Sequence, residues 1–250
     1  TFDRDKKLLM EMGIEIKFKR STMTYQIVNE EFSVSSQTIF DNILLLNAYK
    51  QTENNSGIMI FEKRTSRGLE NLNGLLHAIQ NRKTISFNYT KHWENISHKK
   101  VLEPYALKEF KNRWYLLANE VDGKDFFLKT FGLDRISDVE VNSKTFKKQE
   151  VDIDKLFVNS FGIISTLDQI PEKIILSFDY EQGKFIKTLP IHHSQKVLID
   201  NDSEYRIELT LVPTYDFYQE LLTHTGRMKI ISPENVKIEY FKYINSAKEI

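Results

Sequence analysis

Two adjacent histidines, His192 and His193, are the side chains of this sequence that most invite a metal or acid–base interpretation. On an extended segment, adjacent side chains point to opposite faces, so the two make a poor chelating pair. No further histidine or acidic residue stands at the usual ligand spacing. We expect a structural or interface role for this stretch, with Ser194 and Gln195 bonding the backbone, and the sequence predicts no metal site.

The sequence also shows no motif for a catalytic nucleophile or for a phosphate-binding loop. The sequence has no cysteine, which excludes disulfides, thiolate nucleophiles and cysteine-based zinc sites. Ser165 and Ser194 lack the strand-to-helix elbow of a serine nucleophile, and the nine glycines are scattered rather than grouped in a phosphate loop. We therefore predict a protein that is not an enzyme, with no catalytic residues and no cofactor.

Basic residues gather near the start of the chain. They are Lys6, Lys7, Lys17, Lys19 and Arg20. A loosely helical pattern over residues 2–12 is followed by two alternating stretches, 14–19 and 24–28, that predict a hairpin. A helix followed by a basic hairpin resembles the end of a winged helix, and such a cluster positions a protein on phosphates without reading sequence. An ordinary surface unit with a solvated basic face explains the same residues equally well.

Length and composition limit the remaining possibilities. The chain has 250 residues, long for one domain and comfortable for two, and 40% of them are hydrophobic, enough for real cores. With 35 basic and 35 acidic residues the net charge is zero, so nucleic-acid binding must depend on local clusters. No apolar run approaches ~20 residues and no leader pattern is visible, so we expect no membrane span and a cytoplasmic location. Because the sequence begins at Thr1, we interpret it as a fragment lacking N-terminal sequence.

The elements that would position any site follow in two groups, and together they predict an α+β protein. Residues 36–49 and 69–81 have helical patterns. Five short strands then follow with tight polar turns at Asn112 and Asp122-Gly123, which favours a small barrel or curled sheet. These strands are Thr84–Tyr89, Lys99–Glu109, Arg113–Val121, Asp125–Gly132 and Ile136–Val141.

After residue 151 the pattern changes to strand, helix, strand, strand, helix, strand. This order is that of a ferredoxin-like domain. The strands are expected at 173–178, 196–199, 205–212 and 228–231, with helices at 181–189 and 216–225 and a last helix opened by Ser232-Pro233.

Four stretches, in this order and at these intervals, closely resemble the WYL domain. They are Ile85-Ser86-Phe87-Asn88-Tyr89, Lys100-Val101-Leu102-Glu103-Pro104-Tyr105, Asn112-Arg113-Trp114-Tyr115-Leu116 and Phe131-Gly132-Leu133-Asp134-Arg135-Ile136. The resemblance implies an Sm-like, SH3-type β-barrel over residues 67–150. It extends to residues 190–195, 216–222 and 231–236, which resemble the C-terminal extension of the same family, placed as a ferredoxin-like domain at 151–250. Residues 1–31 then correspond to a remnant of a winged helix-turn-helix, joined by a helical linker at 32–66.

WYL proteins are typically transcriptional regulators, and the resemblance implies the roles of individual residues. Basic positions around the motif would contact a ligand: Lys100, Arg113, Lys129 and Arg135, together with Tyr115 from the motif. Guanidinium groups bind phosphate bidentately and lysine serves as a point charge, which agrees with a phosphate-bearing effector. The alternative is that Arg135 pairs with Asp134 or Glu103 and Lys100 is a solvated surface lysine. Tyr89 and Tyr105 could stack on a base, although core packing explains both.

The resulting hypothesis is a bacterial DNA-binding regulator, a homodimer whose WYL domain senses single-stranded nucleic acid or a nucleotide. In the full-length protein, duplex DNA would be bound through the N-terminal domain, with Arg4, Lys6, Lys7, Lys19 and Arg20 as contacts. Two alternatives stay open: the WYL and C-terminal domains serve only dimer assembly, or they sense a metabolite that is not a nucleotide.

Overall fold

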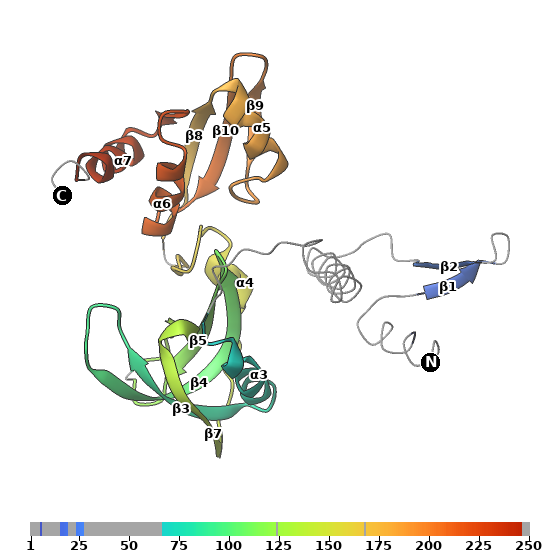
Figure 1. The fold of residues 1–250 in the computed structure, drawn as a ribbon, viewed down its shortest axis with the longest axis vertical. Coiled ribbons are helices and arrows are strands. Elements are labelled where there is room, and N and C mark those ends of the chain that lie inside the picture. The colour runs from blue at the N-terminus through green and yellow to red at the C-terminus, as the bar shows by residue number, and fades with distance from the viewer. Residues whose placement is uncertain are drawn as a thin grey trace, which may run out of the picture. The chain divides into compact units, whose positions relative to one another are not determined.

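The computed structural model describes residues 6, 16–19, 24–27, 67–123, 125–167 and 169–246 (Figure 1). The chain divides into two compact units, Thr1–Arg64 and Thr65–Ile250. In the first unit, β1 (Ile16–Lys19) pairs antiparallel with β2 (Thr24–Ile27), which confirms the predicted hairpin. Apart from the helical residue Lys6, the helices expected over 2–12 and 36–49 lie outside the described residues.

The second unit begins with a five-stranded antiparallel sheet, drawn in cyan to yellow-green in Figure 1. A 3-10 turn, η1 (Leu69–Asn71), leads into α3 (Leu72–Gln80) and then into the strands. The strands are β3 (Lys83–Thr90), β4 (Ser97–Phe110), β5 (Arg113–Glu120), β6 (Leu128–Gly132) and β7 (Ile136–Thr145), in the spatial order β6-β5-β4-β3-β7. All five strands predicted from alternation are therefore present, although β6 begins at Leu128 and not at Asp125.

The β4–β5 hairpin is closed by a two-residue turn of the type that the twist of paired strands favours. Lys111 and Asn112 both have positive φ, 49° and 61°, as a type I′ turn requires. Asparagine tolerates this conformation better than most residues, and the Glu109 carboxylate accepts the Asn112 N–H at 2.8 Å. The turn fixes the register in which Arg113 faces Phe110 and Tyr115 faces Lys108.

Strand β5 is covered on both faces, because successive side chains alternate between two hydrophobic clusters. Leu116 and Ala118 are fully buried in the cluster beneath α3, and Trp114 packs against it. Leu117 points the other way, into a cluster that α4 (Ile153–Phe157) helps to cover. This confirms that Trp114 and Leu116 share one face, and β5 is anchored along its length.

The barrel expected here is not closed among the described residues. Strands β6 and β7 form the two edges of the sheet, no ladder joins them, and the 3-10 turn η2 (Leu133–Arg135) connects them directly. What the structure gives is an α+β arrangement of mostly antiparallel sheets, with an open five-stranded sheet in place of a complete barrel.

The chain then forms a four-stranded antiparallel sheet with the order β11-β8-β10-β9, drawn in orange in Figure 1. Its elements follow the predicted succession of strand, helix, strand, strand, helix, strand. They are β8 (Glu172–Phe178), α5 (Tyr180–Thr188), β9 (Lys196–Asp200), β10 (Tyr205–Leu211), α6 (Tyr215–Thr223) and β11 (Met228–Ser232), followed by α7 (Glu234–Ser246). Along β10 every second side chain, from Tyr205 to Leu211, is buried, which places the core on one face of this sheet.

Candidate ligand-binding site

The five residues predicted to bind a ligand divide into two groups at opposite ends of β5. Arg113, Tyr115 and Arg135 belong to the end that starts β5, and Lys100 and Lys129 surround Glu120 at the other end. Glu120 lies seven positions after Arg113 along the extended strand, a span of about 23 Å. A single small anion therefore cannot contact both groups at once.

At the first end, the Asp134 carboxylate lies between two arginines. Arg113 Nη1 donates to Asp134 Oδ2 at 2.8 Å, and Arg135 Nε lies 3.7 Å from Asp134 Oδ1. The Arg135 Nε is buried and has no hydrogen-bond partner among the residues that the structure describes. Asp134 thus accepts a hydrogen bond from Arg113 but none from Arg135 Nε. The Arg135 guanidinium therefore keeps an unused donor beside the Asp134 carboxylate. The expected alternative pairing of Arg135 with Asp134 is also seen.

This arrangement depends on the glycine that precedes it. A Cβ at Gly132 would lie 2.6 Å from Asp134 Oδ1 and 2.7 Å from Arg135 Nη2, closer than real contacts allow. Gly132 also faces Tyr115 across the β5–β6 ladder. The absent side chain leaves the space in which Asp134 and Arg135 approach the strand.

Two tyrosines border the same end of β5. The Tyr89 ring centroid lies 5.3 Å from the Arg135 Cζ atom, within cation–π range, and the ring packs edge-on against Phe131. Burial raises the pKa of Tyr89, with Arg135 opposing the shift, and burial likewise raises the pKa of Tyr115, opposed by Arg113. Both phenols are therefore neutral at physiological pH. Tyr115 is only 8% exposed, and core packing accounts for most of its surface.

At the second end, Glu120 holds both lysines. Lys100 Nζ donates to Glu120 Oε1 at 2.8 Å, and Lys129 Nζ donates to Glu120 Oε2 at 2.7 Å. These hydrogen bonds lower the pKa of Glu120, since they favour its charged form. Lys100 is thus paired rather than simply solvated, and each carboxylate oxygen already has one lysine donor.

The tip of the β4–β5 hairpin contacts the elements around the four-stranded sheet. Phe110 packs edge-on against Phe161, whose ring in turn lies 6.1 Å from Phe217 of α6. Lys111 Nζ lies 2.7 Å from Glu220 Oε2 and His224 Nε2 lies 3.5 Å from Oε1, and these two neighbours lower the pKa of Glu220 to about 2. Sequence reasoning missed these residues, because no local pattern relates a hairpin tip to a helix about a hundred residues later.

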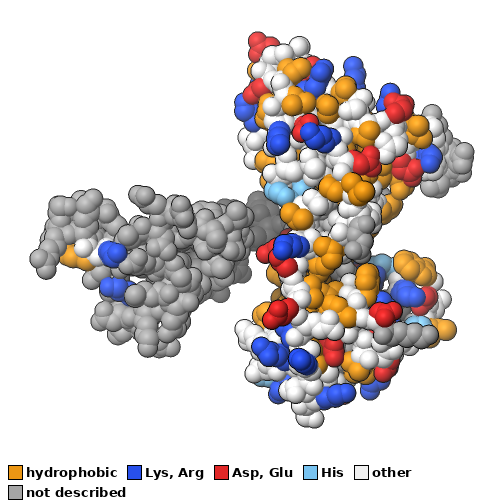
Figure 2. Space-filling model, turned by 180° about the vertical axis from the view of Figure 1, so that it is seen from behind, with side chains coloured by type: hydrophobic (Ala, Val, Ile, Leu, Met, Phe, Trp, Pro, Cys, Tyr) orange, Lys and Arg blue, Asp and Glu red, His pale blue; other side chains and the backbone are white. Residues whose placement is uncertain are grey.

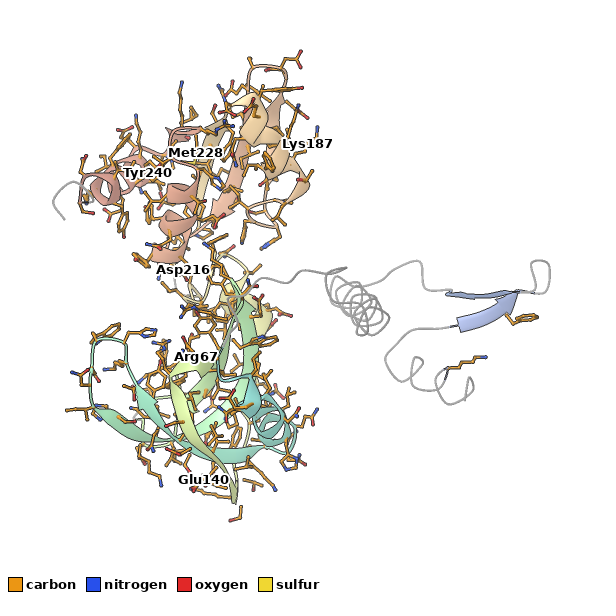
Figure 3. The ribbon with its side chains drawn as sticks, viewed as in Figure 1. Arg67, Glu140, Lys187, Asp216, Met228 and Tyr240 are labelled. Carbon is orange, nitrogen blue, oxygen red and sulfur yellow. The ribbon has the colours of Figure 1, made fainter. Side chains whose placement is uncertain are left out.

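A second link involves the segment between α4 and β8. The Asp216 carboxylate accepts the Ile163 N–H at 2.9 Å, and Thr130 of β6 donates to the Ile163 carbonyl at 3.1 Å. Figure 3 shows Asp216 at the end of α6 nearest to this segment. The Asp216 charge also acts on the Tyr115 phenol. The first end of β5 is therefore electrostatically connected to α6.

The two histidines do not behave as an extended segment would predict. Residues 191–194 form a bend and turn, and the ring centroids of His192 and His193 lie 4.0 Å apart, so the expected opposite orientation is wrong. Burial first, and then His193, lower the pKa of His192 to about 4, while its Nδ1 lies 2.8 Å from Ser194 Oγ. Ser194 and Gln195 do bond the backbone, at the Thr210 N–H and the Ile186 carbonyl. No cluster of metal ligands occurs among the described residues.

The predicted DNA contacts are mostly outside the described part of the chain. Arg4, Lys7 and Arg20 lie outside the described residues, and so does the side chain of Lys19. Lys6 is helical and half-buried. Over residues 67–246, Figure 2 shows basic side chains interspersed with acidic ones on the face in view. None of the helices in the described ranges is long and apolar enough to cross a membrane.

Comparison with known proteins identifies the segment that carries these groups. Residues 70–141 match the WYL domain family, so the chain contains a WYL domain. Among solved structures, it is similar to proteasome accessory factor B/C (PafBC) of Arthrobacter aurescens, at 14% identity and a TM-score of 0.32, over 77% of this chain and 28% of that one. It is also similar to a CRISPR Cas-related protein, at 13% identity and a TM-score of 0.43, over 73% of this chain and 51% of that one. The chain thus spans about half or less of each, and no curated protein matched its sequence.

Proposed function

We propose that this chain is the sensing part of a transcriptional regulator, and that its WYL domain binds a phosphate-bearing effector, either single-stranded nucleic acid or a nucleotide. One observation carries the proposal: Arg113 and Arg135 share the Asp134 carboxylate, and Arg135 retains a buried, unpartnered Nε among the described residues. A phosphate could bind both guanidinium groups, because each offers a fork of donors that matches its oxygens.

In this proposal Asp134 is an internal competitor of the effector. Its carboxylate holds Arg113 in a half-exposed ion pair, and such a pair contributes little to stability and exchanges readily. A phosphate that takes the place of this carboxylate can bond to Arg113 and also to Arg135, whose Nε lies 3.7 Å from Asp134. Tyr89, which is buried beside Arg135, supports that guanidinium through a cation–π contact.

The signal would pass through the β4–β5 hairpin. Arg113 is the first residue after the turn that carries Lys111, and Lys111 is paired with Glu220 of α6. An effector that favours one position of Arg113 therefore favours one set of contacts at the tip, which is a shift between pre-existing arrangements. In the full-length protein such a shift would alter the spacing of paired DNA-binding domains. The same proposal includes a winged helix that contacts duplex DNA, a homodimer and a cytoplasmic location. It also includes the Sm-like and ferredoxin-like fold classes.

The test is fluorescence polarisation of a short labelled single-stranded DNA titrated with this chain at about 50 and 200 mM salt, where contacts to a polyanion weaken steeply. Arg113→Ala and Arg135→Ala should each weaken binding by about tenfold, the loss expected for a charge-assisted hydrogen bond. Arg227→Ala is the matched control, because Arg227 is similarly exposed and its guanidinium also pairs with a carboxylate at 2.8 Å, that of Glu181, with Asp179 at 3.9 Å. Equal affinity of all four proteins would refute the nucleic-acid proposal.

A second candidate function is assembly alone. It is favoured by large apolar side chains that are exposed on α5, directly after it and on the edge strand β9, namely Phe185, Leu189 and Val197. In that case sedimentation should report a dimer, Phe185→Glu should convert it to a monomer, and neither single-stranded DNA nor nucleotides should raise the melting temperature.

A further inference from the structure

A pocket of about 390 Å³ lies on the same face of the β4–β5 hairpin as Tyr115, but it includes none of the residues predicted to bind the phosphate-bearing effector. Its volume is at the lower end of the range of small-molecule sites, about 300–1,000 Å³. The walls are largely apolar and come from strands β4 and β5, helix α4 with the residue after it, and the turn at His193. They include Leu117, Ile153, Phe157 and Val158.

One cation is held in this pocket without a salt bridge. Lys108 extends from β4, directly opposite Tyr115 in the ladder, and its Nζ lies 4.5 Å from the centroid of the Phe157 ring. It forms no salt bridge within the described ranges; Glu109 and Asp154 act on it only at longer range. Burial lowers the pKa of Lys108, which means that the folded protein withdraws this ammonium group from water without supplying a carboxylate in contact.

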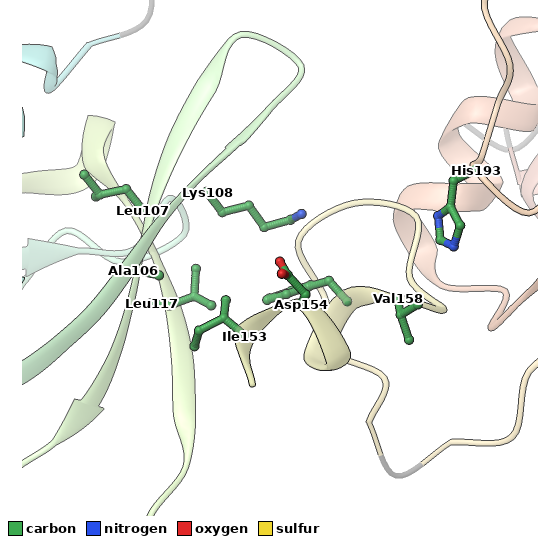
Figure 4. A pocket seen from close by; sticks show the side chains of 9 residues that line it. Ala106, Leu107, Lys108, Leu117, Ile153, Asp154, Val158 and His193 are labelled. Atoms are coloured by element: carbon green, nitrogen blue, oxygen red, sulfur yellow. The ribbon is translucent and has the colours of Figure 1, made fainter. Parts of the chain in front are cut away.

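The remaining polar groups restrict what could supply that contact. Figure 4 shows Lys108 and Asp154 pointing into the same pocket, with His193 facing it from the turn before β9. The Asp154 carboxylate is exposed and therefore solvated, whereas Lys108 is half-buried. A ligand with several negative charges would be repelled by Asp154, while a single negative group could reach Lys108 and leave Asp154 in water.

We propose that this pocket binds a small monocarboxylate with an apolar body, whose carboxylate pairs with Lys108 and whose body packs on Leu117, Ile153 and Phe157. The site is separate from the one shared by Arg113 and Arg135, and the proposal does not depend on the nucleic-acid function. Because the walls come from β4, β5, α4 and the turn at His193, a bound ligand contacts the five-stranded sheet and the turn that leads into the four-stranded sheet at the same time. It therefore stabilises the arrangement in which the hairpin and the turn approach each other.

The experiment uses octanoate as the probe, titrated into the full 250-residue chain and followed by two-dimensional NMR of the backbone amides. Saturable shifts are expected for residues around Lys108, Ile153 and Val158. Two matched probes test the role of charge: 1-octanol keeps the apolar body without the carboxylate, and n-octylammonium reverses the sign. Both should bind at least about tenfold more weakly than octanoate, the difference expected for one charge-assisted hydrogen bond.

Three variants separate the charge, the cavity and the neighbouring site. Lys108→Met keeps the apolar stem and should weaken octanoate binding about tenfold. Lys155→Met is the control and should leave binding unchanged, because Lys155 belongs to α4 but does not line the pocket. Val158→Trp fills the pocket from its rim and should abolish binding while the amide spectrum stays folded. Arg113→Ala should leave octanoate binding unchanged even where it impairs DNA binding.

The proposal is overturned by any of three results. Octanoate could cause no saturable shifts; octanol could bind as well as octanoate, which would make the pocket merely apolar; or Lys108→Met could bind octanoate with unchanged affinity. Loss of octanoate binding in Arg113→Ala would contradict the claim of a separate site. Failure of the DNA titration with octanoate binding intact would refute the proposed function alone.

Discussion

The five-stranded and four-stranded sheets differ in how strongly the fold shifts the pKa of their ionisable groups. Around the five-stranded sheet, the charged pairs are partly exposed: the Arg113 side chain is 55% exposed and that of Lys129 is 47% exposed. Around the four-stranded sheet, burial lowers the pKa of His192, which is 8% exposed, to about 4, and the pKa of Glu220 is lowered to about 2. The Lys111–Glu220 pair, at 47% and 22%, is nevertheless as exposed as the Lys129–Glu120 pair, at 47% and 23%. Exposed pairs exchange partners at little cost, whereas a group whose pKa is strongly shifted on folding makes the stability of the protein depend on pH. We therefore expect ligand responses from the first region and stability responses from the second.

The largest expected effect concerns His192. Its folded pKa of about 4 lies below the ordinary 6.5, so the folded state binds this proton less readily than the unfolded chain. The stability tied to the neutral ring is complete above pH 6.5 and is lost as the pH falls from 6.5 to 4, by about 3 kcal/mol. Urea unfolding at pH 7.5, 5.5 and 4.5 should show this loss in the wild type and in His98→Gln, whose side chain is exposed, but not in His192→Gln. An identical pH profile in His192→Gln would contradict the buried, neutral ring.

Glu220 should have the next largest effect, in a more acidic range. Its pKa is depressed from 4.5 to about 2, so its stabilising contribution is present above pH 4.5 and is lost as the pH falls toward 2. Glu220→Gln should lower the free energy of unfolding at pH 7 by about 1–2 kcal/mol, less than the full shift implies because the partner Lys111 is half exposed. The same substitution at Glu239, an exposed partner of Lys242, should change it by less than about 0.5 kcal/mol. Equal losses in both variants would show that Glu220 contributes no more to stability than an ordinary exposed carboxylate.

In the five-stranded region, the main change should appear in binding. Asp134→Asn removes the internal competitor, so single-stranded DNA should bind about fivefold more tightly, which corresponds to about 1 kcal/mol. Glu181→Gln makes the same change of charge next to Arg227 and controls for general electrostatics. Polarisation titrations of the two variants at one salt concentration measure the difference. If the two variants gain equally, or if neither gains, Asp134 does not compete for the ligand.

Glu120 should have the smallest effect. Lys100 and Lys129 lower its pKa, so its contribution to stability is present above the ordinary value of 4.5 and is lost below it. Because these pairs are partly exposed, Glu120→Gln should cost at most about 0.5 kcal/mol at pH 7 and should increase DNA affinity less than Asp134→Asn does. Chemical unfolding and the same polarisation assay test both statements. A larger gain than that of Asp134→Asn would place the principal anion contacts at the Glu120 end of β5.

Much of the fold could be predicted because alternation and turn residues are local signals. The strands from Lys83 to Thr145 and the succession after residue 172 follow from such patterns, and Asn112 marks the turn that the structure contains. Helix α4 was not predicted, since five residues are too few to show a helical period. The closure of a barrel was expected from the resemblance, and closure depends on edge pairing that no local pattern reports.

The candidate site was less predictable than the fold. The residue types around the motif pointed to Arg113 and Arg135, and the structure does bring these two to one carboxylate. The separation of Lys100 and Lys129 from them depends on the register of β4, β5 and β6, which the sequence leaves open. The position of Lys108 over Phe157 depends on how α4 packs on the sheet, so no spacing in the sequence indicates that pocket.

The contact between Lys111 and Glu220 also has a consequence for synthesis on the ribosome. The pairings among β3 to β7 are complete once residue 145 has emerged, whereas the partner of Lys111 is made only some hundred residues after the hairpin itself. During that interval the nascent chain presents Phe110 and Lys111 without the Phe161 ring and Glu220 that later cover them. Domains generally fold as units from the N-terminal side during translation, and uncovered aromatic surface is prone to misassembly. We therefore expect the hairpin tip to be a site at which a chaperone or a neighbouring nascent chain binds this protein before its synthesis is complete.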